Sequence, residues 1–139
     1  MSRHSILIVD NEANQRLMIE QALRVLAVDW SIATACSAQE AIDAARLRPP
    51  DLIITDYHMP LMNGLELIAR LRGYQITARI ILITAYSTPE LTAAAQRLAV
   101  DYSLTKPVPL ALLRSLAATA LAAIPEAETR RRSRMEDRA

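Results

Sequence analysis

The stretch DLIITDYHMPLMNGLELIARLR, residues 51–72, decides the fold class of this chain. Its segment Leu52–Ile54 is continuous and apolar, as expected of a parallel strand that is buried on both faces. A loop with a proline and a glycine follows, and Leu65–Arg72 then shows the apolar spacing of an amphipathic helix. The stretch therefore predicts one β–α unit, in which Thr55 and Asp56 end the strand.

The same unit recurs along the chain. Ile6–Val9 and Ile80–Ile83 are similar strand-like runs, whereas Trp30–Ala35 and Val100–Leu104 are more mixed and are expected nearer the sheet edges. Further helices are predicted at Ala13–Ala27, Ala38–Leu47, Pro89–Ala99 and Leu110–Ile124. Five such units predict an α/β fold with an open, doubly wound parallel sheet and right-handed crossovers.

Composition places the chain among ordinary globular proteins. It has 139 residues, of which 52% are hydrophobic and 22% charged. No apolar run approaches the roughly 20 residues that a bilayer span requires, and the N-terminus lacks signal-peptide architecture, so we expect a cytoplasmic protein. The single cysteine, Cys36, excludes a disulfide framework and is expected to be buried or half-buried. A net charge of +1 argues against direct nucleic-acid binding by residues 1–124.

The pattern changes after residue 124. Residues 125–139, PEAETRRRSRMEDRA, have no apolar stripe and mix charges densely. We interpret residues 1–124 as one domain and residues 125–139 as a charged tail or the start of a linker. A basic patch for an acidic partner is the alternative, which the interspersed acids weaken.

Polar residues follow four of the predicted strands. Asp10 ends the first strand, Asp56 the third and Thr84 the fourth, and the only lysine, Lys106, follows the fifth. Because ligands bind outside the carboxyl ends of the strands in such sheets, these residues predict a site. Two carboxylates suit a hard cation such as Mg²⁺ or acid–base chemistry, and a hydroxyl with an ammonium suits phosphoryl oxygens.

The low glycine content restricts the kind of phosphate chemistry. With two glycines the chain has no glycine-rich loop for a nucleotide, which disfavours a nucleotide- or flavin-binding enzyme. The phosphate would therefore be small or covalently attached, and a carboxylate can serve as the nucleophile that accepts it.

Four stretches, ILIVDNE, DLIITDYHMPLMNGLELIARLR, ILITAY and LTKP, resemble in order and spacing the receiver domain of two-component response regulators. They span residues 6–107, the final helix extends the resemblance to about 124, and the segment from Asp56 to Gly64 is the most specific part. The resemblance implies the flavodoxin-like strand order 2-1-3-4-5 with five flanking helices. It also implies a signalling domain that catalyses only its own phosphorylation and dephosphorylation.

The resemblance assigns a role to each residue at the strand ends. Asp56 would be the phosphoacceptor, taking its phosphoryl group from a sensor histidine kinase or phosphotransfer protein. Asp10, the Asp56 carboxylate and the backbone carbonyl of His58 would bind Mg²⁺. Lys106 would pair with a phosphoryl oxygen, and its bond to the following proline would be cis. Thr84 would hydrogen-bond another phosphoryl oxygen and report phosphorylation.

Some positions depart from the pattern of the family. Asn11 stands where a second, directly metal-binding acid is usual, so it would be at best a weakened ligand. It keeps open the alternative of a pseudo-receiver, an interaction module that signals without phosphorylation. Ser103 stands where an aromatic switch residue is common, and the adjacent Tyr102 should face the other way. Bulky Tyr86 and His58 beside the site predict slow loss of the phosphoryl group.

The last predicted helix offers a surface for a partner. After its sheet-facing residues are assigned, Leu112, Leu116 and Leu121 remain partly uncovered. We expect a contact there, either in a homodimer or with an effector. The alternative is an alanine-rich helix with scattered exposed leucines.

Overall fold

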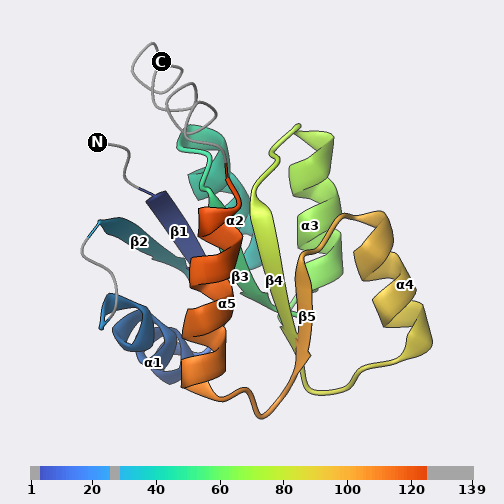
Figure 1. Cartoon of the computed structure of the whole chain (residues 1–139). Coiled ribbons are helices and arrows are strands. Elements are labelled where there is room, and N and C mark those ends of the chain that lie inside the picture. The colour runs from blue at the N-terminus through green and yellow to red at the C-terminus, as the bar shows by residue number, and fades with distance from the viewer. Residues whose placement is uncertain (1–3, 26–28, 125–139) are drawn as a thin grey trace.

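A computed structural model of the chain describes residues 4–25 and 29–124. Within these ranges, five strands alternate with five helices (Figure 1). The strands are β1 (His4–Val9), β2 (Trp30–Ala35), β3 (Leu52–Asp56), β4 (Arg79–Thr84) and β5 (Tyr102–Thr105). The helices are α1 (Ala13–Arg24), α2 (Ala38–Leu47), α3 (Gly64–Gly73), α4 (Pro89–Arg97) and α5 (Leu110–Ala122).

The strands form one sheet in the order β2-β1-β3-β4-β5. Each strand pairing in the described sheet is parallel, so all the strand carboxyl ends lie at one edge. The predicted α/β class, the doubly wound sheet and the order 2-1-3-4-5 are confirmed.

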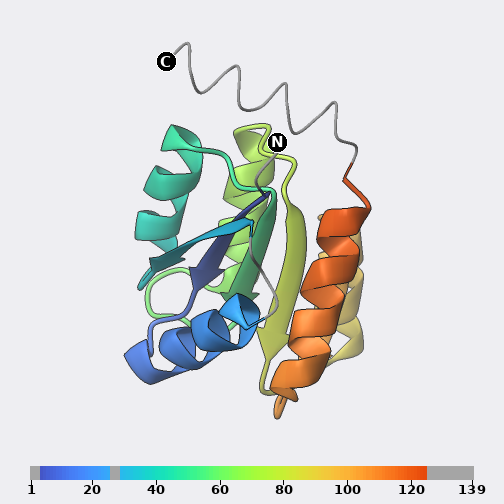
Figure 2. The ribbon, with the colours of Figure 1, turned by 60° about the vertical axis from the view of Figure 1, so that its left-hand side comes forward.

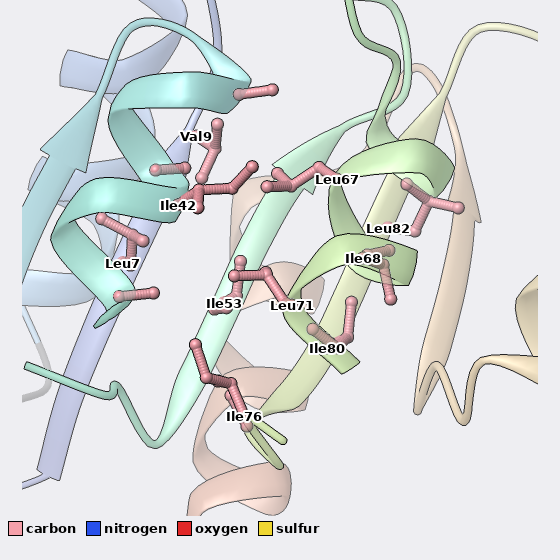
Figure 3. Close-up of a cluster of buried hydrophobic side chains, with 14 of the residues drawn as sticks. Leu7, Val9, Ile42, Ile53, Leu67, Ile68, Leu71, Ile76, Ile80 and Leu82 are labelled. Atoms are coloured by element: carbon pink, nitrogen blue, oxygen red, sulfur yellow. The ribbon is translucent and has the colours of Figure 1, made fainter. Parts of the chain in front are cut away.

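Helices cover both faces of the sheet (Figure 2). Because successive strand residues point to opposite faces, Ile6 and Ile8 of β1 pack with α1 and α5. Leu7 and Val9 pack with α2 and α3 on the other face, in the cluster that Figure 3 shows. Burial on both faces explains the continuous apolar runs of the central strands and leaves the sheet edge for polar residues.

The boundary between α4 and β5 differs from the prediction. Ala99 has a φ of 59°, and the N–H of Val100 donates to the carbonyl of Ala95 at 3.0 Å. Val100 therefore belongs to the turn that closes α4, and β5 begins at Tyr102. The helix itself ends at Arg97.

Two predictions about burial are wrong. Cys36 is exposed, and its thiol donates to the Glu40 carboxylate at 2.9 Å. Leu121 is only 2% exposed, because it packs into the layer that α1 and α5 share. Leu112, at 44% exposure, and the half-buried Leu116 remain partly uncovered, as predicted.

Some predictions concern residues outside the described part of the chain. The charged tail or linker at 125–139 is one, so the domain boundary at 124 stays a prediction. Helix α1 is described to Arg24, and the end predicted at Ala27 lies outside the described residues. In the part of the chain that is described, no helix is long and apolar enough to span a bilayer.

Candidate functional site

The sheet register brings the four predicted strand-end residues to one edge. The residue before Asp10 pairs with the residue before Asp56. Asp56 pairs with the residue before Thr84, and Thr84 pairs with the residue before Lys106. The four positions therefore lie side by side where the parallel strands end, as the sequence predicts.

Asp56 is the most constrained group of this site. Its side chain is buried, and the Lys106 ammonium lies 3.1 Å from its Oδ2. The backbone N–H of His58 donates to its Oδ1 at 3.3 Å. Each carboxylate oxygen of Asp56 is thus held by one donor, Oδ2 by the charged ammonium and Oδ1 by a backbone N–H. These contacts fix the orientation of the carboxylate.

Asp10 is a second buried carboxylate, with 3% of its surface exposed. Its Oδ1 accepts the N–H of Glu12 at 2.9 Å, and the Arg16 guanidinium donates to its backbone carbonyl at 2.6 Å. Burial raises the pKa of Asp10 most, and the negative charge of Asp56 raises this pKa further against the opposing effects of the Glu12 N–H and Lys106. The site therefore holds two acids for one ammonium.

This charge balance and donor chemistry fit a hard divalent cation. In residues 4–25 and 29–124, no group of three or more His, Cys, Asp or Glu side chains could hold a metal. Asp10 and Asp56 would have to be supplemented by a backbone carbonyl, water and phosphoryl oxygens. That donor set is typical of Mg²⁺. The Asn11 and His58 residues are both exposed, which is compatible with an amide or carbonyl oxygen at the rim.

Thr84 is buried, but its hydroxyl is occupied within its own loop. Oγ1 donates to the carbonyl of Tyr86 at 2.9 Å and accepts the Tyr86 N–H at 3.3 Å. The Tyr86 side chain itself is 75% exposed. The Lys106 N–H donates to the Thr84 carbonyl at 2.8 Å, and the Lys106–Pro107 bond is cis, as the resemblance implies.

Gly64 lies close to the backbone of Asp56. A Cβ at this position would lie 2.6 Å from the carbonyl oxygen of Asp56. The N–H of Gly64 also donates to the carbonyl of Tyr57 at 2.8 Å, and the capping box of Asn63 and Glu66 starts α3 here. The sequence predicts a backbone role for this glycine. The structure shows that a side chain at position 64 would collide with the Asp56 carbonyl.

Sequence reasoning missed two features of the site. The first is Arg16, whose position in the first turns of α1 lets it reach back to the strand end; its spacing of six from Asp10 was the available signal. The second is a cavity of about 450 Å³ beside Lys106. Its wall combines α1, the ends of β4 and β5, and the start of α5, including Met18, Ile19, Ile83, Tyr86, Leu110 and Leu113.

Comparison with known proteins agrees with this architecture. A family model of the response regulator receiver domain matches residues 6–118. The chain is 36% identical over 129 residues to the response regulator protein PilR of Pseudomonas aeruginosa, covering 92% of this chain and 28% of PilR. It is 35% identical over 132 residues to an uncharacterized 14.6 kDa protein of Leptolyngbya boryana, covering 91% of this chain and 98% of that protein.

Solved structures show the same fold. The signal receiver domain of an HD domain-containing protein from Pseudomonas fluorescens has a TM-score of 0.78 at 28% identity, covering 86% of this chain and 95% of that one. The signal receiver domain of a putative Luxo repressor protein from Vibrio parahaemolyticus has a TM-score of 0.80 at 22% identity, covering 86% and 91%. The chain spans less than half the length of some curated relatives, such as 43% of the TcrX protein of Mycobacterium tuberculosis.

Proposed function

Because this chain belongs to the response regulator receiver domain family, we propose that it accepts a phosphoryl group on Asp56 and signals by a change in conformation. A receiver domain is a signalling module rather than an ordinary enzyme. The observation that supports the proposal best is the buried Asp56 carboxylate, 3.1 Å from the Lys106 ammonium and next in the sheet to a second acid, Asp10.

The proposed donor is the phosphohistidine of a sensor histidine kinase or a phosphotransfer protein. A carboxylate oxygen of Asp56 attacks the phosphorus, so that a P–O bond forms while the P–N bond breaks. The imidazole leaves with the electron pair and takes up a proton from solvent. Lys106 then exchanges part of its contact with Asp56 for a phosphoryl oxygen, which keeps its positive charge next to the developing negative charge.

Mg²⁺ is the proposed cofactor. Asp10, the Asp56 carboxylate and the backbone carbonyl of His58 would hold it, and when bound it would neutralise charge on the phosphoryl oxygens. Asn11 would contribute an amide oxygen at most. With Asp10 and Asp56 as the two charged ligands, the carboxylates only balance the ion, so its affinity should be lower than with an acid at position 11.

Thr84 is the proposed sensor of the phosphoryl group. Its buried hydroxyl lies at the strand end next to Asp56, and it can rotate from its own loop toward a phosphoryl oxygen. The loop that follows would then lose a contact it has in the unphosphorylated protein. This change supplies the two arrangements that a switch requires.

The exposed side of α5 is a proposed contact surface for a second copy or an effector. Leu112 and Leu116 form it, without the buried Leu121. Sedimentation of the phosphorylated and unphosphorylated protein at high concentration tests the homodimer. If the protein is a monomer in both states, the homodimer is excluded and an effector remains as the proposed partner of this surface.

Phosphorylation itself is tested by incubation with a small phosphodonor and Mg²⁺ followed by intact-mass measurement. We expect one added phosphoryl group on the wild type and none on Asp56→Asn. Asp43→Asn, a matched change on the exposed side of α2, should be phosphorylated like the wild type. An unmodified but folded wild type would instead support the pseudo-receiver, the candidate that the neutral Asn11 favours.

A further inference from the structure

We propose that Tyr86 is the aromatic reporter of phosphorylation in this protein, and that its ring moves from solvent into the cavity between α1 and α5 when the Thr84 hydroxyl turns to the phosphoryl group. The inference rests on the proposed phosphorylation of Asp56. Tyr86 would be the residue that carries the change in conformation from the phosphorylation site to the protein surface.

The hydroxyl of Thr84 is hydrogen-bonded to the backbone of Tyr86 in the unphosphorylated protein. Its hydroxyl donates to the carbonyl of Tyr86 at 2.9 Å and accepts the N–H of the same residue at 3.3 Å. A hydroxyl has a single proton to donate. It cannot donate fully to the Tyr86 carbonyl and to a phosphoryl oxygen at the same time, so a bond to the phosphoryl group releases the carbonyl of Tyr86 and leaves only the longer contact from its N–H.

No aromatic side chain occupies the position on β5 where the family commonly has its switch residue. At Ser103, where an aromatic side chain would face away from the α1/α5 layer, the chain carries an exposed hydroxyl. Tyr102 points the other way, as predicted, and packs against the α1/α5 layer. Among the described residues, Tyr86 is the aromatic residue whose backbone is hydrogen-bonded to Thr84. It is therefore the aromatic residue that a movement of the Thr84 hydroxyl would affect directly.

A cavity beside Tyr86 offers room for its ring. Tyr86 already lines this space of about 450 Å³ while 75% of its surface remains exposed. Met18 and Ile19 of α1 and Leu110 and Leu113 of α5 give the cavity an apolar wall. Burying an aromatic ring against such a wall is favourable, and the phenol hydroxyl can stay at the wet mouth.

The movement would reach the surface through a short segment. Helix α4 begins at Pro89, and Thr88 caps it by accepting the Leu91 N–H at 3.1 Å. Only Ser87 separates Tyr86 from Thr88, the cap at the start of the helix. A displacement of Tyr86 would therefore change both the start of α4 and the rim between α1 and α5.

The test uses ¹⁹F NMR on the full chain labelled with 3-fluorotyrosine. The chain has four tyrosines, and Tyr86→Phe assigns the resonance of interest. After addition of the small phosphodonor and Mg²⁺, we expect the Tyr86 resonance to shift and its broadening by a soluble paramagnetic probe to fall severalfold. The resonance of Tyr74, which stacks under Arg46 on another part of the fold, should stay unchanged.

Two matched variants separate the coupling from phosphorylation. Thr84→Val removes the hydroxyl, so its Tyr86 resonance should be the same with and without a phosphoryl group. Thr105→Val makes the same change at the exposed neighbouring position of β5 and should behave like the wild type. Intact mass is recorded for every sample.

The outcomes distinguish the two levels of the proposal. A wild-type protein that gains a phosphoryl group while Tyr86 stays equally exposed overturns the reporter role and leaves the proposed function standing. A wild type that gains none overturns the proposed function, and the reporter role with it. The wild-type signal decides this even if Thr84→Val is phosphorylated poorly.

Discussion

Replacing Gly64 by alanine should distort the backbone of Asp56, the proposed phosphoacceptor, through a single methyl group. The new Cβ would lie 2.6 Å from the carbonyl oxygen of Asp56, 3.0 Å from the Tyr57 Cα and 3.0 Å from the Leu82 Cδ1. Two of these three atoms belong to the backbone, so the contacts cannot be relieved by rotating a side chain. Helix α3 or the end of β3 must move by several tenths of an ångström.

The expected cost follows from two opposing contributions. Overpacking of this kind destabilises by about 1–3 kcal/mol. The change from glycine to alanine in a helix recovers roughly 0.5–1 kcal/mol, because alanine loses less backbone entropy on folding. We therefore expect Gly64→Ala to lower the free energy of unfolding by about 1 kcal/mol, the difference between the middles of the two ranges, and by no more than about 2.5 kcal/mol.

Gly73 offers the matched control at the other end of the same helix. A Cβ there would meet nothing within 4 Å. Gly73→Ala should therefore raise the free energy of unfolding by roughly 0.5 kcal/mol, the entropic gain alone. Urea denaturation of the two variants measures the difference, and the rate of phosphorylation should fall only for Gly64→Ala. Equal stability of the two variants would refute the close contact at Asp56.

Three further predictions concern the acidic site. Burial raises the pKa of Asp10 above its ordinary 3.8. As the pH rises, the unfolded chain therefore releases this proton at a lower pH than the folded protein does. The metal-free protein then loses stability between pH 3.8 and the folded-state pKa. Asp10→Asn should abolish that loss and be more stable than the wild type at neutral pH without Mg²⁺; thermal unfolding across pH checks it, and an unchanged pH profile would count against it. Asn11→Asp should tighten Mg²⁺ binding on the order of tenfold, or about 1.4 kcal/mol, by adding a charge at the rim; equal affinities in a titration would make the amide a neutral substitution. Replacing Tyr86 and His58 together by alanine should shorten the lifetime of the phosphoprotein severalfold, because both flank the site; a lifetime as long as that of the wild type would show that they do not restrict water.

The fold was predictable because the signals along the sequence agree with one another. Isoleucine-rich runs bounded by polar strand ends at Asp10 and Asp56 leave little choice other than a buried parallel sheet. Once the strands are parallel and sequential, the strand ends must share an edge, so the positions of Thr84 and Lys106 followed from the same reasoning.

What the sequence could not predict depends on tertiary contacts. Helix α5 is apolar on almost every side, so its periodicity does not single out the face that buries Leu121. The direction of the Thr84 hydroxyl depends on a loop that has no periodic pattern, and the exposure of Cys36 depends on how the chain leaves β2. The contact of Arg16 with the Asp10 carbonyl likewise needs the relative placement of α1 and β1.

The most direct test of the central proposal is to locate the acyl phosphate. Borohydride reduces an aspartyl phosphate to homoserine, which peptide mapping by mass spectrometry places on a single residue. After treatment with a phosphodonor and Mg²⁺, we predict homoserine at position 56 in the wild type and at no position in Asp56→Asn. Homoserine at another aspartate, or none in a folded and Mg²⁺-saturated wild type, would contradict the assignment of Asp56 as the phosphoacceptor.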